Sequence, residues 1–155
     1  MKNLEITHQK EFMNSLLNKE QFDDFLLKEA LIKTSNTFHI DGLINRDYYD
    51  NDEDIIGEEA PYDYIVWSKI KNTIRSLIVG KHVPVSMKIT LYFKPDLMKK
   101  IIGEGNSAID YLILNLHFGS KNMSLTTGVA YKEFTLDKDY ELRWDKYMSD
   151  MLMDY

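Results

Sequence analysis

Apolar and polar residues alternate most clearly over residues 84–94, where Met87, Ile89, Leu91 and Phe93 occupy every second position. Alternation of this kind predicts a strand with one face against a core. Residues 25–34 fit a helical stripe as well as a strand, and the strand is favoured because β-formers continue to residue 40. A bulge is expected near residues 35–36, and Asp41-Gly42 predicts a type I′ turn into Leu43-Ile44. A second hairpin is predicted from residues 109–118 and 123–134.

Helical periodicity marks four other segments. Residues 8–18 predict a short helix with Thr7 as its cap, and residues 95–102 predict another that begins at a proline. An apolar stripe with helical spacing runs through residues 62–79, and another runs from about residue 138 to the end. Trp67 and Trp144 lie in these two stripes, which predicts that both are core anchors whose indole N–H finds an acceptor.

These elements follow in the order α-β-β-α-β-α-β-β-α. We therefore predict one α+β domain over residues 1–155, since the chain of 155 residues suits a single core. Its mainly antiparallel sheet has about five strands, in two hairpins and a lone strand, and about four helices cover chiefly one face.

Local charge changes sign abruptly in the middle of the chain. Residues 41–63 carry nine carboxylates and one arginine, whereas residues 64–95 carry six lysines or arginines and no carboxylate. Adjacent blocks of opposite charge either neutralise each other or serve a partner. The acidic part, at about residues 47–63, is expected to be a loop that lies against the helix over 62–79.

Composition restricts the chemistry and the location. The chain has no cysteine, so thiol chemistry, disulfides and thiolate zinc sites are excluded. No apolar run approaches the length that spans a membrane, and the first residues do not resemble a secretion signal. A cytoplasmic protein without membrane contact is expected.

Motifs for catalysis, metals and cofactors are incomplete. The run of acidic residues 50–54 begins like a calcium loop, but Ile55 and Pro61 stand where glycine and glutamate are required. Residues 103–107 share only two glycines with phosphate-binding loops, so a plain loop is expected there. His39 and His117 fall on different predicted strands and are able to meet in space. We expect no metal and no cofactor, and the sequence identifies no catalytic residue.

The basic stretch is the best candidate for a working surface. It predicts a non-catalytic binding module for an unknown protein or an anionic ligand, with these candidate residues: Lys69, Lys71, Arg75, Lys81, Lys88 and Tyr92. One alternative is an enzyme for a small anionic substrate, in which those cations hold the substrate and His39 or His117 transfers the proton. Another is a weak nucleic-acid binder, because Lys88, Tyr92 and Lys94 would share a strand face. The methionines of the C-terminal helix also suit a homodimer contact.

Several short strings are similar to one protein family. They are Asn36-Thr37-Phe38-His39-Ile40-Asp41-Gly42, Trp67-Ser68-Lys69, Ser76-Leu77-Ile78-Val79-Gly80-Lys81, Thr126-Thr127-Gly128, Phe134-Thr135-Leu136-Asp137-Lys138 and Trp144-Asp145. They resemble a family of short bacterial proteins, frequent among anaerobic Gram-positive bacteria, that is known only as a domain of unknown function. The resemblance implies a cytoplasmic bacterial protein, and it implies no activity, ligand or catalytic residue.

Overall fold

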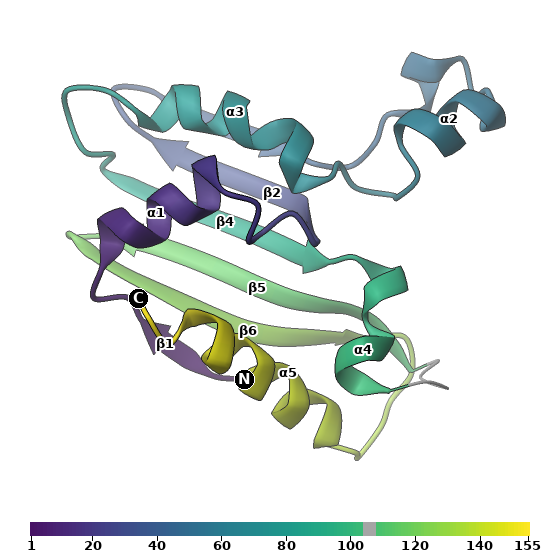
Figure 1. Ribbon diagram of the computed structural model, residues 1–155. Helices are drawn as coiled ribbons and strands as arrows, with labels where there is room; N and C mark the ends of the chain where they lie inside the picture. The colour runs from purple at the N-terminus through teal and green to yellow at the C-terminus, as the bar shows by residue number, and fades with distance from the viewer. Residues whose placement is uncertain (104–107) are drawn as a thin grey trace.

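A computed structural model describes residues 1–103 and 108–155 of the protein (Figure 1). The loop predicted over residues 103–107 therefore lies almost wholly outside the described residues. The elements follow in this order: β1 (Asn3–Glu5), α1 (Gln9–Asn18), β2 (Phe25–Lys33), β3 (Thr37–Asp41), a 3-10 turn (Arg46–Tyr49), α2 (Glu53–Glu59), α3 (Trp67–Ile78), β4 (Ser86–Phe93), a 3-10 turn (Pro95–Leu97), α4 (Lys99–Ile102), β5 (Ile109–Gly119), β6 (Asn122–Tyr131) and α5 (Asp139–Leu152).

The strands form one antiparallel sheet in the order β1-β6-β5-β4-β2-β3. The predicted lone strand is β4, and it pairs with β2 on one side and β5 on the other. The predicted β5–β6 hairpin is present, and Ser120 and Lys121 at its turn have positive φ angles. The α+β class and the antiparallel sheet are thus confirmed.

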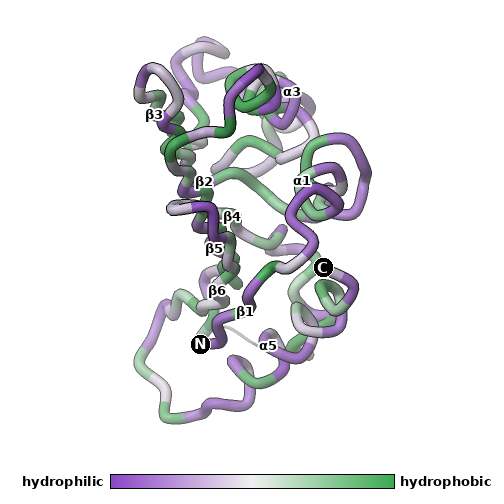
Figure 2. Tube along the Cα trace, turned by 90° about the vertical axis from the view of Figure 1, so that its left-hand side faces the viewer, coloured by the Kyte–Doolittle hydropathy of each residue, from purple (hydrophilic) through white to green (hydrophobic). Residues whose placement is uncertain are grey.

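Helices cover one face of this sheet. Figure 2 shows α1, α3 and α5 on the same side of the strands, with α1 beside the C-terminal end of the chain. Every second residue of β4, namely Met87, Ile89, Leu91 and Phe93, is buried against these helices. Their neighbours on the strand point to the open face, because side chains alternate across a pleated sheet.

The element count differs from the prediction at two places. Over residues 1–103 and 108–155 the sheet has six strands and there are five α-helices, whereas about five strands and about four helices were expected. The extra strand, β1, has three residues and pairs with β6 at the edge of the sheet. A segment this short and polar has no apolar periodicity that would predict a strand. It is a strand because it pairs with the outer edge of β6.

The first hairpin turns earlier than predicted. The chain reverses at residues 34–36, where Thr34 N donates to Asn36 O, and the bulge of β2 lies instead between Leu27 and Glu29. Asp41-Gly42 is not a hairpin turn. Gly42 lies buried against β2, because its N–H donates to Lys28 O over 2.9 Å.

The acidic segment is an ordered arm and was wrongly predicted to be a loop. We call residues 46–59 the acidic arm; its two short helical pieces project beyond the end of the sheet (Figure 1). The Asp52 carboxylate caps α2 by accepting from Asp54 N at 3.0 Å and Ile55 N at 3.3 Å. A capping aspartate followed by acidic residues in the first turn is a helix-start signal, and it was present in the sequence.

Replacing Asp52 with alanine should loosen the start of α2. Loss of a capping side chain costs about 1 kcal/mol, which corresponds to roughly fivefold in local opening. Hydrogen exchange measured by NMR should therefore be about fivefold faster at the amides of Asp54 and Ile55. Glu58→Ala removes the same charge without touching the cap, and it should leave these two amides unchanged. Equal acceleration in both variants would contradict the capping role.

The C-terminal stripe packs against the sheet. Trp144, Met148 and Leu152 are buried, and the Trp144 indole donates to Ile113 O over 2.9 Å. The predicted role of Trp144 as a core anchor is thereby confirmed. Leu142 of α5 and Met153, which follows its last residue, remain exposed, so a dimer through this helix would have to use its outer face.

Candidate functional site

The six predicted binding residues do not share one surface. Lys69, Lys71 and Arg75 lie on α3, which packs on the helical side of the sheet. Lys88 and Tyr92 lie on β4 at the positions between the buried ones, so they face the open side. Lys81 follows α3 in the exposed segment that leads to β4. The sheet itself therefore separates the two halves of the predicted surface.

Two of the α3 lysines hold the fold together. The Lys71 side chain is only 14% exposed and pairs with Asp23 over 3.0 Å. Its ammonium also donates to Lys19 O, just past the C-terminal end of α1, where helices leave carbonyls without partners. Lys69 donates to Glu59 O over 2.5 Å. The acidic arm thus contacts α3 through a backbone carbonyl. Among residues 1–103 and 108–155, the ion pair of an α3 cation with an acidic side chain is Lys71–Asp23, and Asp23 lies outside the arm.

The candidates on the open face have close neighbours of their own. Lys88 lies between Leu31 of β2 and His117 of β5 in the strand register. The Tyr92 ring stacks on Tyr111 with ring centres 4.2 Å apart, and the Tyr64 ring meets it edge-on. One face of the Tyr92 ring is therefore already covered, which leaves less of it for stacking on a nucleic-acid base.

The two candidate histidines do not meet. His39 and His117 share the open face, but β2 and β4 lie between their strands. Three strand spacings separate them by about 14 Å. His39 contacts Glu29 at 3.2 Å. Within residues 1–103 and 108–155, no group of three or more histidine or acidic side chains is arranged to hold a metal ion.

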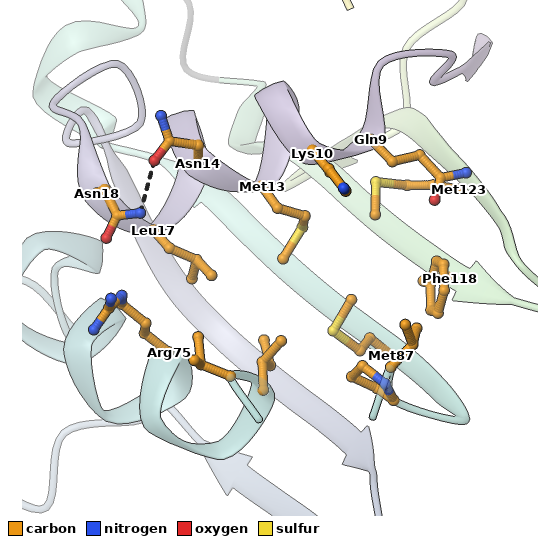
Figure 3. A pocket seen from close by; sticks show the side chains of 14 residues that line it. Gln9, Lys10, Met13, Asn14, Leu17, Asn18, Arg75, Met87, Phe118 and Met123 are labelled. Carbon is orange, nitrogen blue, oxygen red and sulfur yellow. Dashed lines mark hydrogen bonds between the residues drawn. The ribbon is translucent and has the colours of Figure 1, made fainter. Parts of the chain in front are cut away.

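The strongest candidate site is a groove on the helical side, between α1 and α3 (Figure 3). Its volume is about 430 Å³, within the range of about 300–1,000 Å³ that small-molecule sites occupy. We call it the α1–α3 groove, and its lining is Gln9, Lys10, Met13, Asn14, Leu17, Asn18, Arg75, Ile78, Val79, Val83, Pro84, Met87, Phe118 and Met123.

The floor and walls of the groove are apolar. Met87, Phe118 and Met123 form the buried floor, supplied by three neighbouring strands. Val79 and Val83 are 60% and 73% exposed, so this wall presents apolar surface to solvent. Three methionines line the groove together with these valines, and thioether side chains adapt easily to differently shaped ligands.

Among residues 1–103 and 108–155, the side-chain hydrogen bonds that join α3 to the chain of α1 lie at one end of the groove. The Trp67 indole donates to Leu16 O over 2.8 Å, and Lys71 bonds to Lys19 O. These contacts lie at the end of α1 and the beginning of α3. Farther along, Arg75, Ile78 and Val79 line the groove opposite α1, above the buried strand residues of its floor.

The rim carries positive charge. Lys10 of α1 and Arg75 of α3 line the groove, and among the described residues no carboxylate belongs to the lining. In the part of the chain that the structure describes, neither cation is paired with an acidic side chain. Figure 3 shows Arg75 below Asn18, whose amide bonds to Asn14. An apolar cavity with two cations at its rim is suited to a ligand with an apolar body and an anionic end.

Arg75 is the one predicted binding residue that lines this groove. Sequence reasoning missed the others, because apolar residues that line a groove have the same periodicity as apolar residues in a core. Lys10 carried a weak signal, since it is a polar residue beside the apolar face of a short predicted helix.

Comparisons with known proteins give a family but no function. Residues 15–155 match the model of a protein family described as "Family of unknown function (DUF5721)". A search of curated proteins finds no match, and neither does a search of solved structures. The resemblance found in the sequence, to a family without assigned activity, is therefore confirmed.

Proposed function

The chain belongs to this family of unknown function, and we propose that it is a non-catalytic binding module whose α1–α3 groove takes an anionic ligand with an apolar body. One observation carries the proposal: an apolar cavity of ligand size has two cations at its rim and no carboxylate in its lining. Of the basic residues predicted from the sequence to bind a ligand, this proposal keeps Arg75, and it adds Lys10 as a second cation of the groove lining.

Both parts of the ligand have a physical reason. An apolar chain would cover the exposed surfaces of Val79 and Val83, and such burial is favourable by about 25 cal/mol for each Å². The anionic end would pair with Lys10 or Arg75, and a hydrogen bond to a charged partner contributes about 1.5–3 kcal/mol. The chain's net charge of −6 makes such a cationic rim locally distinctive.

The alternative functions have weaker support. An enzyme for a small anion would need a proton-transfer group near the cations that hold the substrate. His39 and His117 lie on the open face of the sheet, away from Arg75. A nucleic-acid surface would need its cations and aromatic rings together, and Arg75 and Tyr92 lie on opposite sides of the sheet.

Location and assembly are further parts of the proposal. None of the described helices is long and apolar enough to cross a membrane. A cytoplasmic location and a homodimer through α5 stay predictions from the sequence, and the exposed Leu142 and Met153 are the residues that such a dimer would cover.

Binding of decanoate tests the groove directly. Decanoate should shift the methyl NMR signals of Met13, Met87 and Met123, whereas Met148, a buried residue of α5 outside the groove, should not respond. The double variant Lys10→Gln/Arg75→Gln should bind decanoate at least about tenfold more weakly, because tenfold corresponds to about 1.4 kcal/mol. Decanol, which has the same chain without the charge, should bind both proteins equally.

Lys2→Gln is the matched control, since it removes an exposed cation outside the groove. It should leave the affinity for decanoate unchanged. Loss of decanoate binding in this control, or unaltered binding in the double variant, would refute the role of the rim cations. Absence of methyl shifts with either ligand would refute the groove itself.

A further inference from the structure

A second pocket lies between the acidic arm and the open face of the sheet. Its volume is about 410 Å³. We call it the tyrosine pocket, and its lining is Leu43, Ile44, Arg46, Ile56, Tyr62, Asp63, Tyr64, Asp110 and Tyr111. Three aromatic rings and two carboxylates converge there, and the groove used for the proposed function shares no residue with it.

The rings of this pocket are held in fixed positions. Tyr64 packs edge-on against Tyr111, with ring centres 6.0 Å apart and planes at 83°. The Tyr62 hydroxyl donates to Asp96 over 2.9 Å. Tyr111 is supported from behind by the stacked ring of Tyr92. Rigid aromatic walls are what a site for organic cations needs, because the negative face of each ring attracts positive charge.

The carboxylates of the pocket form no ion pair within the described part of the chain. No lysine, arginine or histidine among residues 1–103 and 108–155 forms an ion pair with Asp63 or Asp110. The one cation in the lining, Arg46, is engaged with Glu53 of the arm. Two negative charges therefore remain to attract a ligand.

The position of Asp110 has a structural cause. The register between β5 and β6 shifts between Ile109 and Tyr111, so Asp110 is the extra residue of a β-bulge. Bulges redirect side chains and are frequent beside functional sites. Here the bulge leaves Asp110 next to Tyr111, where a regular strand would have turned it to the other face of the sheet.

Burial and the nearby carboxylates both act on the tyrosines of this pocket. Burial, followed by the charges of Asp63 and Asp110, raises the pKa of Tyr111 to about 12. Burial is also the main cause that raises the pKa of Tyr92, with Tyr64 and Asp110 contributing next. A cation in the pocket would relieve this accumulation of negative charge.

We propose that the tyrosine pocket binds an alkylguanidinium or alkylammonium cation, held by Asp63 and Asp110 between the rings of Tyr62, Tyr64 and Tyr111. Leu43 and Ile56 supply apolar contact for the alkyl part. The cation is either a free small amine or guanidine, or the side chain of an arginine or lysine on a peptide. Both sources present the same group to the pocket.

Titration with butylguanidinium and with the tripeptide acetyl-Gly-Arg-Gly-amide tests the proposal and separates the sources. Each probe has a neutral counterpart of the same shape, butylurea and the citrulline tripeptide. We expect at least one cationic probe to shift the ring NMR signals of Tyr64 and Tyr111, and the neutral counterparts to have no effect. Tyr131, which bonds to Glu141 of α5, serves as the internal reference. Response to butylguanidinium indicates a free ligand, and response to the peptide alone indicates a side chain.

The double variant Asp63→Asn/Asp110→Asn should bind the cationic probe at least about tenfold more weakly. Asp54→Asn/Glu58→Gln removes the same charge from the arm without touching the pocket lining, and it should change the affinity by less than about twofold. Thermal unfolding of both variants shows whether each is folded. Equal loss in both variants, or equal binding of the neutral counterparts, or no shift with any probe, would overturn the proposal. Since these readouts do not involve decanoate, the outcome is independent of the α1–α3 groove.

Discussion

Replacing Gly42 with alanine is expected to destabilise the protein by about 3 kcal/mol or more, in the range of the largest single-residue effects. An added Cβ would overlap the backbone oxygen of Leu27, and it would lie 2.7 Å from the carbonyl carbon of the same residue. These atoms belong to β2 at its bulge, and Leu27 is fully buried. Leu27 pairs with Leu91 of β4, so its backbone cannot move aside without disturbing that pairing.

Two hydrogen bonds keep Gly42 in this place. Its N–H donates to Lys28 O, and its carbonyl accepts from Ile65 N, each over 2.9 Å. The close approach therefore joins β2 to the segment before α3. Moving Gly42 away to admit a methyl group would sacrifice both bonds as well as the packing. Urea unfolding followed by circular dichroism should show a much lower midpoint with an unchanged slope.

Gly57→Ala provides the matched control. Gly57 lies inside α2, and a Cβ there would meet no atom within 4 Å. This variant should be neutral or slightly more stable, because alanine is favoured over glycine in a helix by about 1 kcal/mol. A loss of less than about 1 kcal/mol in Gly42→Ala would contradict the close approach seen in the structure.

Trp67→Ala is expected to cost about 3–5 kcal/mol, as is usual when a large aromatic core residue is removed. Trp67 is fully buried, and its predicted role as a core anchor is confirmed. It also donates its indole N–H to Leu16 O, one of the last carbonyls of α1. Trp67→Phe keeps most of the ring and loses this bond, so it should cost less, about 1–3 kcal/mol.

The free energies of unfolding of the two Trp67 variants separate the two contributions. Trp67→Phe loses the hydrogen bond, and Trp67→Ala loses the packing of the ring as well. Leu142→Ala is the control for removal of an apolar side chain from a helix surface, since Leu142 is exposed on α5. Its free energy of unfolding should stay within about 0.5 kcal/mol of the wild type.

The hydrogen bond from Trp67 also joins α1 to α3 beside the groove. Trp67→Phe should therefore weaken decanoate binding while the protein remains folded, and unchanged binding would show that the groove does not depend on this link.

Much of the fold could be predicted because the relevant patterns are local. The alternation in β4 and the helical stripes of α3 and α5 arise from residues that lie against one continuous core. The turn of the first hairpin was misplaced because Asp41-Gly42 has the composition of a type I′ turn. In the structure, Gly42 is needed for its close approach to Leu27. A glycine required by a distant backbone and a glycine required by a turn look alike in the sequence.

The candidate site was less predictable, although one error was avoidable. Lys88 alternates with Met87 and Ile89, so a helix that packs on those residues cannot share a surface with Lys88. The division of the basic residues between two faces thus follows from strand geometry. The pairing of Lys71 with Asp23 could not be predicted from the sequence, because Asp23 is far away in the chain and no local pattern connects the two residues.

By itself, the sequence determined the α+β class, most of the strands and helices, and the absence of thiol chemistry, because each depends on composition or on periodicity within a short segment. Only the tertiary structure decided which side chains meet. It placed Arg75 and Lys10 in the lining of one apolar groove, Lys71 at the end of α1, and Asp63 and Asp110 in the lining of one pocket with three tyrosines. The physical reason is that a site is made by contacts between distant segments, and the order of the strands in the sheet sets those contacts.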